Sequence, residues 1–195
     1  LRAMRFAIEG CLKGDGLINP QIAFADSLKR TFRDAETFRS LVKSREFQVH
    51  YQPIVHLDSR AVHHFEALTR FNGNNGPAEA IRMAEELDMI ESFDLAVAEK
   101  VLKRMRQPGA GLLKMAINVS GASLGDDTYV EQLLRMTAGA PEERRRLMVE
   151  VTETSAVADI EAADRRLAAL REAGIKVCID DFGAGAAAFD YLRKL

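Results

Sequence analysis

The stretch VHHFEALTRF, residues 62–71, has the apolar content of a buried strand but carries a glutamate, Glu66, at its centre. A carboxylate in a half-buried strand costs several kcal/mol unless it is paired or binds a metal. Glu66 therefore lies either on the solvated face of its strand or in a functional site. A second strand-like run, FQVHYQPIV at 47–55, precedes it, and the short polar turn HLDSR joins the two. Such a short connection predicts an antiparallel pair of strands.

Beyond this hairpin the sequence alternates between helices and strands. Helices are predicted at 77–106, 127–138, 156–173 and 184–195, and strands at 112–119, 147–153 and 175–181. Repeated strand–helix units with apolar strands indicate an α/β fold, a parallel sheet covered by helices. Residues 36–195 are predicted to form this domain. Residues 1–35 are predicted to be a helical lead-in, which either links an upstream region or simply packs on the domain.

The composition is that of an ordinary soluble globular protein, with 47% hydrophobic and 29% charged residues. A net charge of −2 gives no support for a surface that coats a nucleic-acid polymer. No apolar run has the length of a membrane span. The two cysteines, Cys11 and Cys178, are far apart in the sequence, which favours a reduced, cytoplasmic protein.

Every predicted strand carries an oxygen-bearing side chain near its C-terminal end. These residues are Gln52, Glu66, Asn118, Glu150 with Glu153, and Asp180 with Asp181. In a barrel of alternating strands and helices these ends converge on one face. A cluster of carboxylates repels itself unless cations occupy it, and oxygen ligands without Cys or His favour Mg²⁺ or Mn²⁺. A pair of such ions suits the hydrolysis of a phosphodiester.

Most of these residues also have a simpler explanation. Asp180 and Asp181 could form a helix N-cap, and Asn118 could cap a helix or lie in a turn. Glu153 could be a glutamate in the first turn of a helix, where the helix dipole stabilises a negative charge. Glu66 has the poorest explanation of this kind, and the coincidence across all the strands favours a shared site.

The histidines are predicted to be structural or surface residues. His63 and His64 are neighbours in a strand, so we expect their side chains to point to opposite faces and not to share a metal.

Five segments in order resemble the successive signatures of EAL domains: YQPIV at 51–55, FEALTRF at 65–71, INVS at 117–120, VEVTET at 149–154 and IDDFGAG at 179–185. The resemblance begins near residue 36 and runs to the last residue. It implies a TIM-type (β/α) barrel with an antiparallel first strand. It also implies a bacterial phosphodiesterase that hydrolyses the second messenger cyclic di-GMP to the linear dinucleotide with Mg²⁺ or Mn²⁺. The alternative is a degenerate EAL domain that binds cyclic di-GMP as a receptor or scaffold without hydrolysis.

The resemblance also implies roles for single residues. Glu66, Asn118, Glu150 and Asp180 match positions that bind the first metal ion in the family, and Asp181 matches a position that binds the second. The implied catalytic residues are Glu66, Glu150, Asp180 and Asp181. Positions that hold the nucleotide are matched by Gln52, Leu68 and Arg70. The residue that stabilises the loop after the fifth strand is matched by Glu153. The resemblance is also compatible with two kinds of partner, a second copy of the chain in a homodimer and an upstream sensory or regulatory domain.

The sequence departs from the family pattern in several places. Thr69 stands where the family usually has Leu, and the connection NGNNG at 72–76 is shorter than usual. Ala186, Ala187 and Ala188 replace an aromatic residue and two serines, so the resemblance does not extend to the regulation of that loop. The sixth to eighth strands of the family, which supply a lysine, a glutamate and a glutamine, have no counterpart here. The barrel is therefore expected to be incomplete in this chain, and to form no closed wall around the site.

Overall fold

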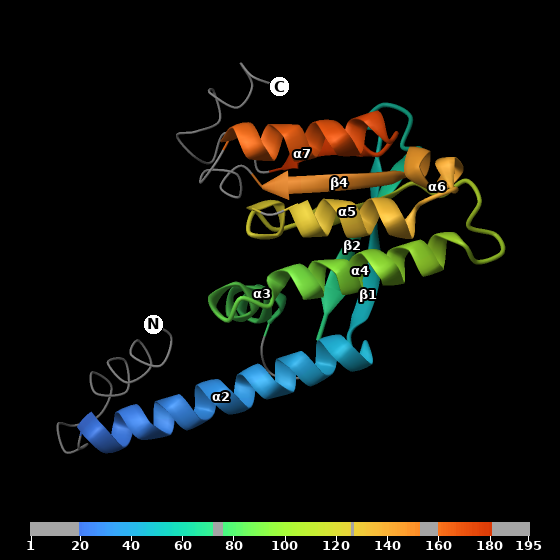
Figure 1. Ribbon diagram of the computed structural model, residues 1–195. Coiled ribbons are helices and arrows are strands. Elements are labelled where there is room, and N and C mark those ends of the chain that lie inside the picture. Colours follow the sequence, from blue (N-terminus) through green and yellow to red (C-terminus); the bar gives the residue numbers. More distant parts are fainter. Residues whose placement is uncertain (1–19, 72–75, 126, 153–159, 181–195) are drawn as a thin grey trace.

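The computed structural model describes residues 20–71, 76–125, 127–152 and 160–180. These residues form a five-stranded sheet with helices packed against it (Figure 1). The strands are β1 (Gln48–Val55), β2 (Val62–Arg70), β3 (Met115–Val119), β4 (Leu147–Thr152) and β5 (Lys176–Asp180). The helices are α2 (Pro20–Ser44), α3 (Pro77–Glu86), α4 (Ile90–Met105), α5 (Asp127–Met136), α6 (Pro141–Arg146) and α7 (Ile160–Glu172), with a 3₁₀ turn, η1, at Ser123–Gly125.

The strands lie side by side in the order in which they occur in the chain. β1 and β2 are antiparallel, with Gln52 opposite Glu66, whereas β2, β3, β4 and β5 run parallel to one another. The predicted hairpin and the predicted parallel sheet are both confirmed. β1 and β5 are the two edges of the described sheet.

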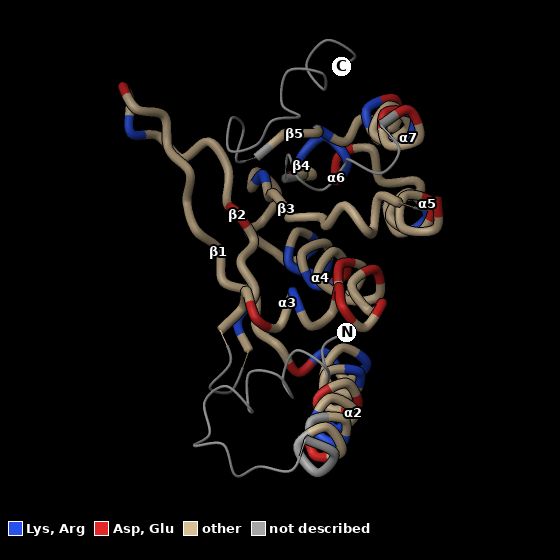
Figure 2. The backbone as a smooth tube through the Cα atoms, turned by 90° about the vertical axis from the view of Figure 1, so that its left-hand side faces the viewer, with Lys and Arg blue, Asp and Glu red and all other residues tan. Residues whose placement is uncertain are grey.

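Alternate residues of the parallel strands point toward the helices and build the core, because successive side chains of a strand point to opposite faces. Figure 2 shows α3, α4, α5 and α7 on one side of the sheet. The buried strand residues that belong to this core are Ala67, Met115, Ile117, Val119, Leu147, Val149 and Val151. The residues between them, Asn118 and Glu150 among them, therefore point to the other face, over which no described helix lies.

Helix α2 is attached to the domain by its C-terminal half. Phe38 and Val42 are buried, and the ring of Phe38 lies 5.7 Å from that of Phe93 on α4. Earlier in the helix, the side chain of Phe32 is 68% exposed. The helix is continuous across the boundary expected between residues 35 and 36, and its N-terminal half extends beyond the sheet (Figure 1).

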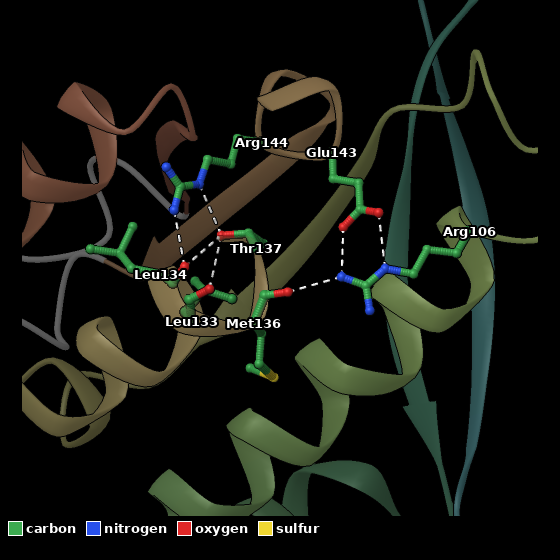
Figure 3. A network of polar contacts seen from close by, with 7 residues as sticks. All are labelled: Arg106, Leu133, Leu134, Met136, Thr137, Glu143 and Arg144. Carbon is green, nitrogen blue, oxygen red and sulfur yellow. Dashed lines mark hydrogen bonds and ion pairs between the residues drawn. The ribbon is translucent and has the colours of Figure 1, made fainter. Parts of the chain in front are cut away.

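A network of arginine contacts holds the C-terminal end of α5 (Figure 3). Arg106 donates two hydrogen bonds to Glu143, of 2.9 and 2.7 Å, and one of 2.9 Å to the carbonyl of Met136. Arg144 donates to the buried hydroxyl of Thr137 at 3.0 Å and to the carbonyl of Leu134 at 2.9 Å. The carbonyls at a helix C-terminus lack partners within the helix, so cationic donors stabilise this end.

The structure differs from the predicted elements in three places. The strand expected over 112–119 is shorter and begins at Met115. The helix expected over 77–106 is two helices, because the chain turns at Asp88, whose φ is +56°. The short helix α6, which starts with Pro141 at a favourable first position, was not predicted. Within the described segments, no helix is both long enough and apolar enough to cross a membrane.

Candidate functional site

Each of the five strands brings a predicted site residue to the same face of the sheet. Asn118 on β3 is the register partner of Glu150 on β4, and partners in neighbouring strands share a face. Glu66 on β2 pairs with Ala116, two residues before Asn118, and with Gln52 across the hairpin. Asp180 pairs with Thr152, two residues after Glu150. The backbone thus places Gln52, Glu66, Asn118, Glu150 and Asp180 on one face, the one opposite the helices.

Glu66 and Asn118 are in direct contact. The Nδ2 amide of Asn118 donates a hydrogen bond of 2.8 Å to Oε1 of Glu66. Glu66 is half-buried and Asn118 is exposed, so this pair lies at the accessible surface of the sheet. An asparagine that donates through its amide nitrogen keeps its carbonyl oxygen as an acceptor. The pair therefore presents carboxylate and carbonyl oxygens, the ligand type that Mg²⁺ and Mn²⁺ prefer.

Glu150 lies above a buried histidine of β2. The Oε1 atom of Glu150 is 3.5 Å from Nε2 of His64, and the two side chains are 13% and 9% exposed. The Nδ1 atom of His64 is 2.7 Å from Nδ1 of His63. Burial, and then the neighbouring His63, lower the pKa of His64 below its ordinary value.

The expectation that His63 and His64 point to opposite faces is wrong. The register of the hairpin shifts at this point, with Ile54 opposite His64 and Val55 opposite Val62. His63 is therefore the extra residue of a β-bulge, which interrupts the alternation of side chains and brings the two imidazoles together.

A pocket of about 270 Å³ opens beside Asn118. Leu68 and Arg70 line it from β2, together with Ser120 after β3, Glu85 on α3 and residues of α4. Arg70 is exposed, and its Nη1 donates a 2.8 Å hydrogen bond to the carbonyl of Thr69. The guanidinium group keeps further donors that can reach an anion in the pocket.

Asp94 is buried and forms hydrogen bonds that hold one side of this pocket in place. Its Oδ2 accepts hydrogen bonds from the backbone N–H of Ser120 at 2.9 Å and from the hydroxyl of Ser123 at 2.7 Å. Burial raises the pKa of the Asp94 carboxyl to about 7, although these hydrogen bonds oppose the shift. The contacts hold the segment that follows β3, which begins two residues after Asn118.

Some predicted site residues lie outside what the structure describes. Asp181, Glu153 and the loop residues Ala186, Ala187 and Ala188 are not among the described residues, and only the backbone of Asp180 is. Among the described side chains, no group of three His, Cys, Asp or Glu residues could hold a metal ion. The described part thus places Glu66, Asn118 and Glu150 on one face, and the full ligand set stays a prediction.

The sequence interpretation missed Asp94 and His64. Asp94 lies in a helix, without a motif that distinguishes it from a surface aspartate, and only its burial among apolar neighbours on α4 could have indicated a role. The regular alternation of a strand predicts opposite faces for His63 and His64, and the β-bulge that brings them together leaves no signal in the sequence.

Comparisons with known proteins identify the family. The family model described as "EAL domain" matches residues 35–195. The chain is 32% identical to the cyclic di-GMP phosphodiesterase NbdA of Pseudomonas aeruginosa over 167 residues, which cover 82% of this chain and 21% of that protein. It is 28% identical to the cyclic di-GMP phosphodiesterase PdeF of Escherichia coli over 187 residues, which cover 91% of this chain and 25% of that protein. The chain thus spans about a quarter or less of the length of both relatives.

Solved structures show the same fold. The EAL domain of FimX from Xanthomonas citri, solved with c-di-GMP, aligns with a TM-score of 0.76 at 22% identity, over 88% of this chain and 69% of that one. The PaMucR phosphodiesterase, also a c-di-GMP complex, aligns with a TM-score of 0.73 at 26% identity, over 84% of this chain and 69% of that one. The five-stranded sheet is therefore an incomplete TIM-type barrel with an antiparallel first strand, and the chain belongs to the EAL domain family.

Proposed function

We propose that the parent domain, with its barrel complete, hydrolyses cyclic di-GMP to the linear dinucleotide in the bacterial cytoplasm, with two Mg²⁺ or Mn²⁺ ions. Glu66, Asn118, Glu150 and Asp180 bind the first ion, and Asp181 binds the second. The observation that carries the proposal is the placement of Glu66, Asn118 and Glu150 on one face, with Asn118 in contact with Glu66. Relatives named as cyclic di-GMP phosphodiesterases support it.

The donor set of the described residues fits a hard cation. It consists of carboxylate and amide oxygens from three different strands, and both Glu66 and Glu150 are only partly exposed. When bound, such ions supply a nucleophilic water and stabilise the charge on the attacked phosphate. The strands hold the ligands at fixed separations, so little reorganisation accompanies the reaction.

Residues next to the proposed metal ligands bind the nucleotide. Arg70 donates to a phosphate oxygen, which suits a guanidinium group that is exposed and lines a pocket next to Asn118. Leu68 gives the same pocket an apolar wall. Gln52, exposed and opposite Glu66 in the hairpin, contacts the ligand from the edge strand. Glu153 stabilises the loop that follows β5.

The alternative function is recognition of cyclic di-GMP without hydrolysis. Binding requires the pocket and Arg70, whereas hydrolysis also requires both ions and an enclosed site. The FimX EAL domain that aligns with this chain was solved with c-di-GMP bound, which supports binding for either function.

The proposal is tested by turnover in a chimera that takes the strands closing the barrel from NbdA. We expect cyclic di-GMP to be converted to the linear dinucleotide with Mg²⁺ or Mn²⁺, as followed by chromatography. Glu66→Ala should lower kcat by roughly 10²–10³, because the loss of a ligand removes stabilisation of transition-state charge. Glu131→Ala, at an exposed position of α5, is the matched control and should leave kcat unchanged.

Two results would count against the proposal. Turnover by Glu66→Ala that equals that of the unsubstituted chimera would remove Glu66 from the site. A chimera that binds cyclic di-GMP but does not cleave it would favour the receptor function.

A further inference from the structure

A buried histidine nitrogen lies beneath the proposed metal site. His64 is 8% exposed, and its Nε2 atom has no hydrogen-bond partner among the described residues. The Oε1 atom of Glu150 lies 3.5 Å from this nitrogen. A buried polar atom without a hydrogen bond destabilises the fold, so it needs an explanation in the working state of the site.

The other nitrogen of the same ring determines which proton His64 carries. Its Nδ1 is 2.7 Å from Nδ1 of His63, and a contact this short between ring nitrogens requires a proton on one of them. If His64 held that proton in its neutral form, its Nε2 would present a lone pair to the carboxylate of Glu150. We therefore assign the proton of this contact to His63, which leaves Nε2 of His64 protonated.

His63 is held in this orientation by its surroundings. It is the extra residue of the β-bulge in the hairpin, and the ring of His56 packs edge-on against it at a centroid distance of 5.1 Å. The edge-on contact between His63 and His64 has a centroid distance of 5.0 Å. The two histidines thus form a chain that leads from the hairpin to Glu150.

We propose that His64 is a positioning residue for the metal ligand Glu150, with His63 fixing its tautomer. In the metal-bound site, the Nε2–H group of His64 donates to Oε1 of Glu150 and orients this carboxylate toward the cation. This inference rests on the proposed function, because it assumes that Glu150 is a ligand. Hydrogen bonds of this kind orient a metal ligand, and their loss commonly lowers metal affinity by about 10–100-fold.

The test is a titration of the full 195-residue chain with Mn²⁺ alone, followed by calorimetry. His64→Leu removes the donor, and we expect Mn²⁺ affinity to fall by about 10–100-fold. His64→Gln places an amide N–H near the position of Nε2 and should retain affinity within about threefold of the unsubstituted chain. The matched control is His50→Leu, because His50 is exposed on β1 and contacts Gln48, and this variant should also retain affinity. Thermal unfolding without metal verifies that each variant is folded.

Different results would overturn different parts of the account. A folded chain that binds no Mn²⁺ would overturn the proposed function. Normal Mn²⁺ binding by the unsubstituted chain and equal binding by folded His64→Leu would overturn only the role of His64. Equal losses in His64→Leu and His64→Gln would also overturn it, because the role would then be packing. If His64→Leu does not fold, His64→Asn replaces it: its amide lies near Nδ1 instead of Nε2, so equal affinities for the Asn and Gln variants would contradict the inference.

Discussion

Asp94 lines the candidate pocket and forms hydrogen bonds to the segment after β3. Its burial opposes ionisation of its carboxyl group. Its side chain is 6% exposed, and its Oδ2 accepts the hydrogen bonds from the Ser120 backbone and the Ser123 hydroxyl. The pKa of Asp94 is raised from 3.8 to about 7, chiefly by desolvation. The native protein thus keeps the Asp94 proton at pH values at which the unfolded chain loses it.

This difference predicts a pH-dependent stability. Because the native state binds more protons between about pH 4 and pH 7, the free energy of unfolding should fall as the pH rises through this window. Asp94→Asn keeps an acceptor oxygen without the ionisation, so it should remove this dependence. We expect the difference in stability between the two proteins to change by on the order of 2–4 kcal/mol between pH 4 and pH 8, as measured by urea denaturation. Parallel pH profiles for the two proteins would contradict the assignment.

Arg70 provides a prediction about the ligand. If its guanidinium group donates a charge-assisted hydrogen bond to phosphate, Arg70→Ala should weaken the binding of cyclic di-GMP by about 1.5–3 kcal/mol. Calorimetry with Ca²⁺ in place of Mg²⁺ measures this affinity without turnover. Arg82→Ala, an exposed arginine on α3, serves as the control. Unchanged affinity in Arg70→Ala would make Arg70 a structural residue.

The sequence was sufficient to predict which polar residues of the strands lie together on one face of the sheet, although their roles stay a prediction. Glu66, Asn118 and Glu150 could be identified because each is a polar residue near the C-terminal end of an apolar strand, and parallel strands bring these ends together. The contacts of Asp94 join distant segments, and those of His64 depend on an irregularity of the hairpin backbone. Neither property has a pattern in the local sequence.

The helix ends also show where the sequence is insufficient to predict the structure. Helix α7 ends at Glu172, shortly before Gly174, which has a φ of +90°, and the sequence predicts this end within one residue. Helix α3 ends in the same hydrogen-bond pattern, with the N–H of Met89 bonded to the carbonyl of Ala84 and that of Asp88 to the carbonyl of Glu85. Here the left-handed residue is Asp88. Because the usual glycine is absent, the sequence predicted one helix where the structure has two.

The arginine network at the end of α5 gives a prediction about stability. The hydroxyl of Thr137 is buried, accepts from Arg144 and donates to the carbonyl of Leu133 at 3.0 Å (Figure 3). Thr137→Val preserves the shape but leaves the Arg144 N–H without this acceptor, so it should lower the free energy of unfolding by about 1–2 kcal/mol. Arg145→Ala removes an exposed ion pair with Glu142 and should change stability by less than about 0.5 kcal/mol. Equal effects of the two substitutions in urea denaturation would show that the network adds nothing.

The described sheet is open at both sides. The strands run in the order β1-β2-β3-β4-β5, so β1 and β5 each have one unpaired edge in the described part of the chain. This chain covers 69% of the FimX EAL domain to which it aligns. Closed barrels of this type have eight strands, and their active sites are surrounded by the loops of all of them.

We therefore predict that the 195 residues alone do not hydrolyse cyclic di-GMP, even with excess Mg²⁺ or Mn²⁺. An open sheet does not exclude bulk water or enclose the nucleophile, and a misplacement of the nucleophile by about 1 Å can lower a rate on the order of 10²-fold. The NbdA chimera is the control, assayed under the same conditions by chromatography of the products. Turnover by the monomeric 195-residue chain would show that the open sheet is sufficient for catalysis.

The central claim is that strands β2 to β5 hold a divalent cation at their C-terminal ends. The most direct measurement is an anomalous difference map from crystals of the chain grown with Mn²⁺ and cyclic di-GMP. We predict a Mn²⁺ peak at about 2.1 Å from oxygens of Glu66, Asn118, Glu150 and Asp180, with the nucleotide phosphate beside it. A map with Glu66 and Asp180 directed to opposite ends of the sheet, or with Mn²⁺ bound elsewhere, would contradict the claim.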